Sequence, residues 1–527
     1  MNKESFGLKI TLSKKGIILL AAFLWFSFFV FSFMLHQNFL IGLDLFRITK
    51  NYTFLRYVAE MCIYLCGNLI VFIVPGLFWV HSVVKKDIGF DELLFYSFLI
   101  SLTSLILITT VYKMFAPGGM GRPDFSLMVA FITLLGASRL MTLKEDIKRT
   151  INLDRIDLLI IAILTTLIIL CGWSFKEKII LAHMDRNFSP EHVLSIPLGM
   201  QDDLMEHFGL VDSLKNHLLP YWDLEYANKF GYAVIDPPLH KFISWFLISV
   251  FGQSFAVQSA NSLLAIAASY FFAWKISALN LNSGLYYPLG FLIPLLFLSF
   301  FLVIVNHAES AVVLFNQIHT MYFFVIVQFY FLIKKRDGLF LLFALLSFLT
   351  KYEACLFTLL GLIFYQGIFK PSVKATCILL KRYFFLVMPY LILMTAIGAL
   401  RGDLGAYLEA LIVERFTRVD YLGFIERLYP QSASLWDAFS MAATWEFFRQ
   451  YILASAFLGI FIFVPHKDDK ILSFSKGVAL SYFVLVVISR VKRVHYISPL
   501  IFLSTLVAFR MFMLIRWKKI FKRIPAP

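Results

Sequence analysis

Long apolar runs alternate with short polar segments along this chain, and each run is close to the length of a membrane-spanning helix. A helix needs about 20 apolar residues to cross a bilayer. The pattern predicts about 14 spans, and they fall near residues 16–35, 60–84, 92–113, 124–141, 156–174, 256–276, 284–305, 317–333, 339–350, 352–369, 383–400, 451–465, 471–489 and 497–515. We therefore predict an all-α fold, a polytopic transmembrane helical bundle.

Two segments fit this pattern less simply. Residues 339–369 hold Lys351-Tyr352-Glu353 in the middle of an apolar run, which predicts either one long span or two short ones. Two spans keep the basic segment 370–382 on the same side as the other basic segments, so we favour two. Residues 239–252 are too short to cross, and their Leu, Phe, Ile and Trp pattern is typical of a juxtamembrane helix lying on the outer surface.

Composition agrees with a membrane protein and argues against other classes. Hydrophobic residues make up 60% of the chain and charged residues 15%, whereas soluble domains carry about 25% charged residues. The net charge is +15, and in a membrane protein most of that excess belongs to cytoplasmic loops, so no nucleic acid is expected as a partner. The five cysteines do not form the pattern of a disulfide framework.

The positions of Lys and Arg predict the orientation, because cytoplasmic loops are enriched in both. One arrangement places both termini in the cytoplasm together with Lys85-Lys86, the 144–155 segment, Lys334-Lys335-Arg336 and the 370–382 segment. The same arrangement places the large loops 175–255 and 401–450 outside. Arg490, Lys492 and Arg493 then fall on the outer side, against the rule. That exception indicates either an anionic ligand or a miscounted span.

The longest polar stretch between spans, residues 201–252, carries the candidate chemistry. Asp202 and Asp203 open it at the start of a segment with helical spacing. They are either helix-capping residues or carboxylates that activate an acceptor hydroxyl, and the residues themselves do not decide between the two. Asp203 and His207, one helical turn apart, can share a divalent metal, although two ligands without a third are weak evidence for a metal site.

Cations near the predicted outer face form a candidate phosphate site. Lys351 lies between two apolar runs, where ionisable residues are costly and tend to be functional or paired. Glu353 is too close in sequence to share a helix face with it. Arg415, beside Glu414, suits bidentate binding of a phosphate, although surface ion pairing is the commoner fate of such residues. The candidate phosphate site therefore comprises Lys351, Arg415, Arg490, Lys492 and Arg493. The sequence has no Gly-rich phosphate loop, no GxSxG motif and no zinc-type spacing of Cys and His.

Several short motifs follow one another in a recognisable order. They are Asp202-Asp203, Asp236-Pro-Pro-Leu-His-Lys241, Leu349-Thr350-Lys351, Glu414-Arg415-Phe416, and Arg493-Val-His-Tyr496 ahead of Ser498-Pro499. Over residues 155–515 this order resembles the GT-C glycosyltransferases, in particular the bacterial branch related to protein O-mannosyltransferases and lipid A aminoarabinose transferase. The family often has a second outer acidic residue, but the stretch from Asn316 to Phe324 holds no acid here.

The resemblance implies an integral-membrane glycosyltransferase of the cell inner membrane. Such an enzyme transfers a sugar from a polyprenyl-phosphate-linked donor to an acceptor hydroxyl on a lipid, glycan or protein at the extracytoplasmic side. It implies Asp202 or Asp203 as the catalytic carboxylate and residues 151–527 as the transferase core, with residues 1–150 as accessory transmembrane helices. Further substrate contacts are expected from His207, Tyr221, Trp222, His240, Lys241, Glu414, His495 and Tyr496. Apart from the divalent metal, no cofactor is expected.

Two other classes of protein remain open. A transporter or flippase of lipid-linked glycans would bind the same lipids without cleaving a bond, and transporters often show internal repeats and broken helices at the membrane midplane. The sequence shows no obvious repeat, and its polar residues gather towards the predicted outer face, which favours the enzyme. A polymerase or ligase of surface polysaccharide would rely on outer Arg and His more than on an acidic pair.

Overall fold

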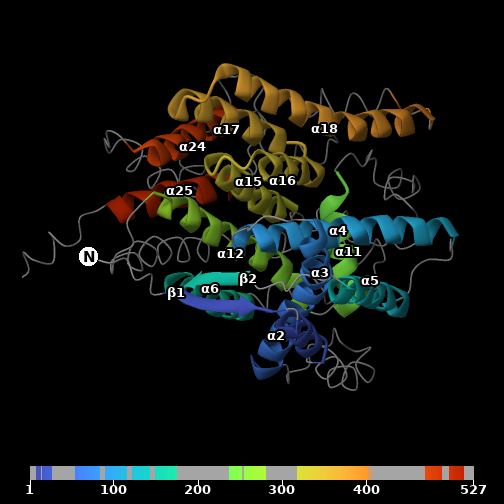
Figure 1. The fold of residues 1–527 in the computed structure, drawn as a ribbon. Helices are drawn as coiled ribbons and strands as arrows, with labels where there is room; N and C mark the ends of the chain where they lie inside the picture. The colour runs from blue at the N-terminus through green and yellow to red at the C-terminus, as the bar shows by residue number, and fades with distance from the viewer. Residues whose placement is uncertain are drawn as a thin grey trace, which may run out of the picture. The chain divides into compact units, whose positions relative to one another are not determined.

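The computed structural model describes a mainly helical protein whose chain forms two compact units (Figure 1). The first unit comprises Met1–Leu224 and Lys241–Leu263, and the second comprises Glu225–His240 and Leu264–Pro527. The structure describes residues 7–13, 15–26, 54–83, 90–115, 122–142, 149–174, 237–251, 255–280, 317–400, 402, 404, 469–488 and 498–514. The functional division of the chain at residue 150 stays a prediction.

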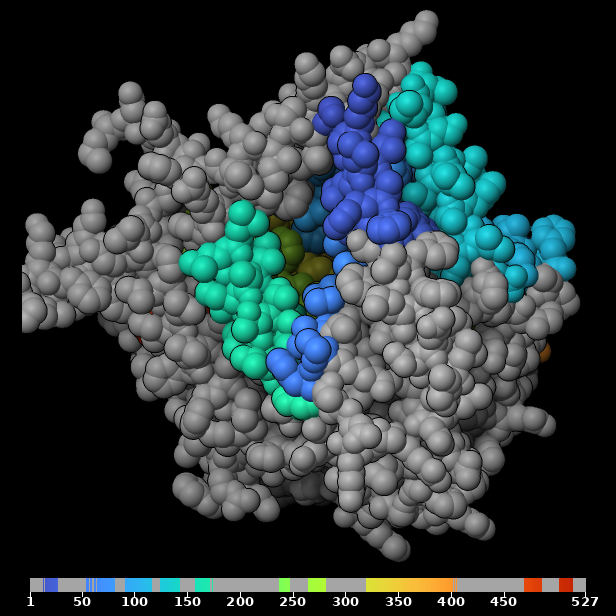
Figure 2. Space-filling model, turned by 90° about the horizontal axis from the view of Figure 1, so that it is seen from below, coloured from blue at the N-terminus to red at the C-terminus, as the bar shows by residue number. Residues whose placement is uncertain are grey.

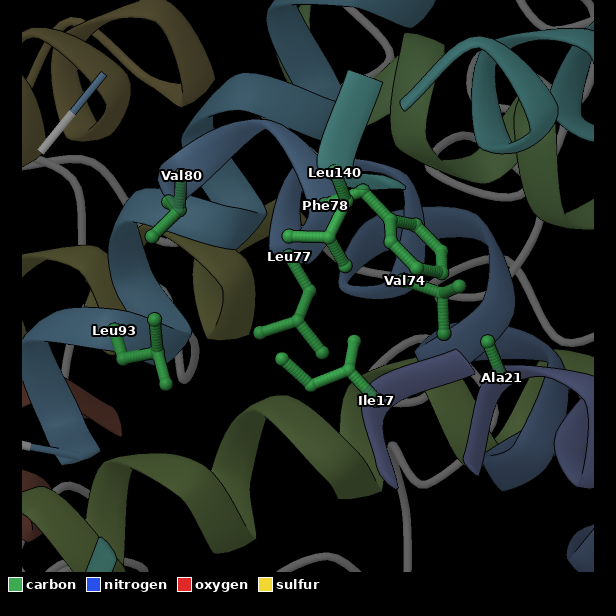
Figure 3. Close-up of a cluster of buried hydrophobic side chains, with 8 residues drawn as sticks. All are labelled: Ile17, Ala21, Val74, Leu77, Phe78, Val80, Leu93 and Leu140. Atoms are coloured by element: carbon green, nitrogen blue, oxygen red, sulfur yellow. The ribbon is translucent and has the colours of Figure 1, made fainter. Parts of the chain in front are cut away.

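The first unit is built around a short central helix. Its described helices are Lys15–Phe26, α2 (Phe54–Phe72), α3 (Val74–Val83), α4 (Phe90–Phe115), α5 (Arg122–Thr142) and α6 (Arg155–Ser174). α3 packs against both α4 and α5. Figure 3 shows part of the core, where Ile17 and Ala21 lie near Val74, Leu77 and Phe78 of α3. These α3 residues recur at helical spacing, which gives the helix an apolar face to bury.

An interruption separates α2 from α3 inside the run that we predicted as one span at 60–84. Pro75 has no backbone N–H and cannot continue the α-helical hydrogen-bond pattern. The backbone N–H of Gly76 donates instead to Oγ of Ser101 in α4, at 2.7 Å. A Cβ at position 76 would stand 1.9 Å from the backbone oxygen of Ser97. The interrupted helix is therefore held against α4 at a position where only glycine fits.

A short two-stranded antiparallel sheet accompanies these helices. β1 (Gly7–Leu12) pairs with β2 (Arg149–Asp154), from Gly7 opposite Asp154 to Leu12 opposite Arg149. The chain enters α6 directly after β2. The sheet thus brings the basic amino-terminal segment next to the basic segment before α6, two segments that the charge pattern places on one side. The prediction of a helical chain is confirmed, and the sheet is an addition to it.

The second unit consists of packed helical hairpins. It contains α15 (Gln317–Ile333), α16 (Asp337–Thr350), α17 (Ala354–Phe369), α18 (Val373–Leu400), α24 (Lys470–Ile488), α25 (Ser498–Leu514) and most of α12 (Phe255–Ala278). α15 and α16 form an antiparallel hairpin through the basic turn 334–336. α17 packs against α24, and the ring contacts Phe357–Tyr482 and Phe369–Phe474 show that these two helices are antiparallel.

The helix predicted at 239–252 is present as α11 (Leu239–Phe251). Its side chains from residue 239 to residue 246 are buried. Trp245 and Phe246 pack on Phe125 of α5, with ring centroids 6.2 and 5.1 Å apart. A helix lying on a membrane surface would leave one face exposed, so the prediction of a surface helix is wrong for this part of α11.

Three described helices are long and apolar enough to cross a membrane: Asp91–Phe115, Asp124–Thr142 and Val373–Leu400. Large apolar side chains are exposed on all of them, including Met114, Phe131 and Phe385. The face of the first unit in Figure 2 likewise presents α6, drawn in blue-green, on which Leu159 and Leu170 are exposed. Water disfavours such surfaces and lipid hydrocarbon does not, which supports a membrane location.

Most predicted spans that fall within the described residues coincide with helices to within a few residues. One boundary is wrong: α18 begins at Val373, so the basic segment 370–382 forms the first turns of that helix rather than a loop. A helix can carry Lys and Arg at this position because their long side chains reach water from near a membrane boundary. The spans predicted at 284–305 and 451–465 lie outside the described residues.

Candidate functional site

The polar triplet 351–353 interrupts the apolar run as predicted. α16 ends at Thr350 and α17 begins at Ala354, and between them Lys351 has an extended backbone with φ −158° and ψ 135°. The backbone N–H of Lys351 still donates to the oxygen of Ser347, and the N–H of Ala354 donates to the oxygen of Lys351. The chain therefore leaves one helix and enters the next within three residues.

Lys351 and Glu353 meet at this break. Their Nζ and Oε1 atoms lie 3.7 Å apart, and the Lys351 side chain is the more buried of the two. The spacing rule for helix faces does not apply here, because neither residue lies in a helix: α16 ends at Thr350 and α17 begins at Ala354. Sequence analysis missed Glu353 as a site residue for this reason; its signal was the position beside Lys351 inside an apolar run.

The amino-terminal end of α15 lies at the same level as Lys351. Phe343 of α16 contacts both Phe324 and Phe331 of α15, at 6.0 and 5.8 Å between ring centroids, so it lies beside the midpoint between them. Lys351 is eight residues beyond Phe343. α15 and α16 are antiparallel and have the same rise per residue. Eight residues before the midpoint between Phe324 and Phe331, α15 therefore reaches the level of Lys351, and the residues there are His319 and Thr320.

A buried histidine contacts this end of α15. Nδ1 of His240 lies 3.1 Å from Oγ1 of Thr320, and both side chains are buried. The tautomer of the ring decides which atom donates. His319, also buried, packs its ring edge against Phe502 of α25. His240 is thus a predicted substrate residue that reaches the level of Lys351, and His319 and Thr320 are additions that sequence analysis missed.

Lys241, the neighbouring predicted substrate residue, is fully buried. A buried ammonium group is costly unless it is paired or hydrogen-bonded. Its burial shows that the Pro-Pro-Leu-His-Lys segment has an interior position rather than one open to solvent.

α24 and α25 bring their ends to the same level. Tyr482 of α24 stacks on Phe357 of α17 at 4.8 Å. Six residues further, α24 ends at Ile488; in the opposite direction, α17 begins at Ala354, directly after the break that holds Lys351. α25 begins at Ser498, one turn before its contact with His319 through Phe502. The helix ends that flank residues 489–497 therefore both lie near the level of Lys351.

Most of the predicted site falls outside the described residues. These residues are Asp202, Asp203, His207, Tyr221, Trp222, Glu414, Arg415, Arg490, Lys492, Arg493, His495 and Tyr496. Their proposed roles, including the divalent metal at Asp203 and His207, stay predictions. Among the described residues no three His, Cys, Asp or Glu side chains lie close enough to hold a metal ion.

The opposite end of the second unit holds a different charged group. Arg510 of α25 donates from Nε and Nη2 to the carboxylate of Asp469, with the shortest distance 2.6 Å. Its Nη1 donates to the backbone oxygens of Ser277 and Leu279 at the end of α12. Asp469 also accepts from the N–H of Leu472 in the first turn of α24. One arginine thus ties together the ends of three helices.

The pKa of Asp469 reflects these contacts. Burial alone would raise it, but the hydrogen bonds and charge of Arg510, together with the backbone N–H of Leu472, outweigh burial and hold the pKa below its usual value. The carboxylate is therefore ionised in the folded protein over the physiological pH range.

The chain matches no family model, no curated protein and no solved structure. Function is therefore inferred from the residues and the geometry described above.

Proposed function

We propose that this chain is an integral-membrane glycosyltransferase that uses a polyprenyl-phosphate-linked sugar as donor and an extracytoplasmic hydroxyl as acceptor. The observation that carries the proposal is the buried lysine at the break between α16 and α17, with two histidines and a threonine at the same level. A cation held in this way can stabilise the negative charge that develops on a departing lipid phosphate.

The flanking sequence adds to this argument. The ends of α24 and α25 that flank Arg490, Lys492 and Arg493 lie near the level of Lys351. Together with Arg415 these cations would bind the lipid phosphate. Asp202 or Asp203 would deprotonate or orient the acceptor hydroxyl, and Tyr221, Trp222 and Tyr496 would stack on sugar or prenyl surfaces. The phosphate is already an activated leaving group, so no covalent nucleophile is required.

We further propose a multi-pass protein of the inner membrane with both termini in the cytoplasm. The pairing of β1 with β2 supports the amino-terminal part of this arrangement, because it joins two of the segments that the charge pattern assigns to the cytoplasm.

The test is sugar transfer from a polyprenyl-phosphate donor in liposomes, comparing wild type with Asp202→Asn, Asp203→Asn and Lys351→Met. Asp212→Asn, in the same predicted loop, is the matched control. We expect at least one of the two aspartate variants to lose transfer while Asp212→Asn retains it. Undiminished transfer in both would rule out the proposed base.

One observation favours the alternative of a lipid-linked glycan transporter or flippase. The pair α2–α3 is a helix interrupted inside a predicted apolar run, and interrupted helices are typical of transporter binding sites. Translocation of a fluorescent lipid-linked sugar across the liposome membrane, without any transfer to an acceptor, would favour this alternative over the enzyme.

A further inference from the structure

The exposed face of α18 changes character along its length. Lys374, Lys381 and Arg382 are exposed near its start, and Phe385 and Ile392 are exposed further on. Their spacings of three, four and seven residues place all of them on one side of the helix. That side therefore carries cations beside the exposed Ile378 in the first turns, and it carries no charged residue from Tyr383 to Leu400. Such a change is typical of a helix that passes from lipid headgroups into hydrocarbon.

The apolar part of α18 matches the thickness of a membrane. From Tyr383 to Leu400 a helix rises about 26 Å, and the hydrocarbon core of a bilayer is about 30 Å thick. Leu400, at the far end, is still largely exposed. The change of character near residue 383 and the end of α18 thus mark the two boundaries of the hydrocarbon.

Tyr390 lies near the middle of this apolar part and fixes the depth of the break between α16 and α17. Its ring contacts those of Phe348 and Tyr352, at 6.2 and 6.4 Å between centroids. Tyr390 is about 10 Å of helix from Tyr383 and about 15 Å from Leu400. Tyr352, which stands between Lys351 and Glu353, is therefore close to mid-depth.

α16 and α17 are each too short to cross the hydrocarbon. They contain 14 and 16 residues, which correspond to about 21 and 24 Å, and this is less than the thickness of the hydrocarbon. Non-helical backbone at such a depth occurs only where protein or a water-filled cavity surrounds it. Thr350 and Lys351 meet this condition because both are buried.

We infer that α16 and α17 form a re-entrant hairpin whose tip, Lys351–Glu353, is an intramembrane binding site for the charged group of an amphiphilic substrate. His319 and Thr320 of α15 stand at the same level and belong to this site. The hairpin enters and leaves on the side of the basic turn 334–336, so the predicted spans 339–350 and 352–369 do not cross, and Lys351 lies at mid-depth rather than near the predicted outer face. The identification of the charged group as a phosphate rests on the proposed function. The depth of the tip does not depend on that function.

Electron paramagnetic resonance tests the depth directly. Single cysteines are introduced on the exposed face of α18 in a chain that lacks its native cysteines. The positions are Lys381, Phe385, Met388, Ile392 and Leu400. Each variant is spin-labelled and reconstituted in phosphatidylcholine–phosphatidylglycerol vesicles. The ratio of the label's collision rate with oxygen to its collision rate with a water-soluble nickel chelate measures its depth in the membrane. We expect the deepest labels at Met388 and Ile392 and shallow labels at Lys381 and Leu400. Maximum depth at Phe385 or at Leu400 would overturn the inference.

Thiol labelling tests the site itself. Tyr352→Cys in the same background is treated with a water-soluble thiol reagent on both sides of permeabilised vesicles, and Lys335→Cys in the exposed basic turn is the control. We expect labelling at 352 to be at least about ten-fold slower than at 335, and slower again with polyprenyl phosphate but not with polyprenol. Equal rates at both positions would overturn the re-entrant hairpin. If the depth is as expected but polyprenyl phosphate has no effect on labelling, the phosphate ligand and the proposed function are contradicted. The re-entrant hairpin would still be supported.

Discussion

The two ends of the second unit each hold a charged pair, and the pairs are built differently. Arg510 binds Asp469 through several short hydrogen bonds and also caps two carbonyl groups of the α12 end. Lys351 and Glu353 stand 3.7 Å apart at a break between two helices, a distance longer than a hydrogen bond. The first arrangement compensates a buried charge with several short hydrogen bonds, whereas the second joins a buried cation to an acid over a longer distance.

The difference distinguishes a structural group from the group to which we propose a function. Burial of two charges costs several kcal/mol unless geometry and additional hydrogen bonds offset it, and the Arg510 cluster meets that condition. At the other end, the proposed function assigns Lys351 a role in binding the lipid phosphate. The comparison predicts large stability effects at one end and large activity effects at the other.

Arg510→Met should have the largest effect on stability. It leaves the Asp469 carboxylate and the carbonyls of Ser277 and Leu279 without their donor, and removal of one partner of a buried pair costs about 3–5 kcal/mol. The free energy of unfolding, measured by SDS titration in mixed micelles, should fall by that amount. Arg382→Met, at an exposed arginine of α18, is the control and should change it by less than about 0.5 kcal/mol. Equal effects of the two variants would contradict the structural role of Arg510.

Lys351→Met should show the opposite behaviour. Loss of a group that stabilises charge in the transition state typically lowers the rate about 100-fold or more. The free energy of unfolding should fall by less than in Arg510→Met, because the 3.7 Å contact of Lys351 with Glu353 is longer than the hydrogen bonds of Arg510. Transfer rate and unfolding are measured on the same preparation, with Lys335→Met as control. If unfolding changed as much as in Arg510→Met, Lys351 would be a structural residue and the comparison would fail.

The sequence predicted the position of the break between α16 and α17 because a polar triplet inside an apolar run has only a few arrangements. It did not predict the contact of Lys351 with Glu353, since residues two apart do not meet on a continuous helix. Arg510 was not singled out either, because a lysine or arginine near the end of a span is usually explained by reaching water. Its partner is 41 residues away, and only tertiary structure shows that the two meet.

The fit between helices also escaped prediction, and Gly477 shows why. The sequence marks it as a glycine in a span, whereas the structure shows that a Cβ there would lie 2.4 Å from the ring of Phe364 on α17. Gly477→Ala should therefore lower the free energy of unfolding by about 1–3 kcal/mol through overpacking. Gly367→Ala in α17 has nothing within 4 Å and should instead stabilise by up to about 1 kcal/mol. Unfolding measurements in which both variants behave alike would contradict the close packing of α17 on α24.

The smallest expected effect is a dependence of stability on pH. The pKa of Asp469 is lowered in the folded state, so its contribution to stability is present above the unfolded value of about 3.9 and is lost as pH falls through the lower folded value. Wild type should therefore lose stability below about pH 4 more steeply than Asp469→Asn, which is less stable at pH 7 but has no carboxylate to protonate. Unfolding in mixed micelles between pH 7 and pH 3 measures both slopes. Parallel slopes would show that Asp469 and Arg510 are not coupled. The Arg510 cluster would then not be the structural group that the comparison requires.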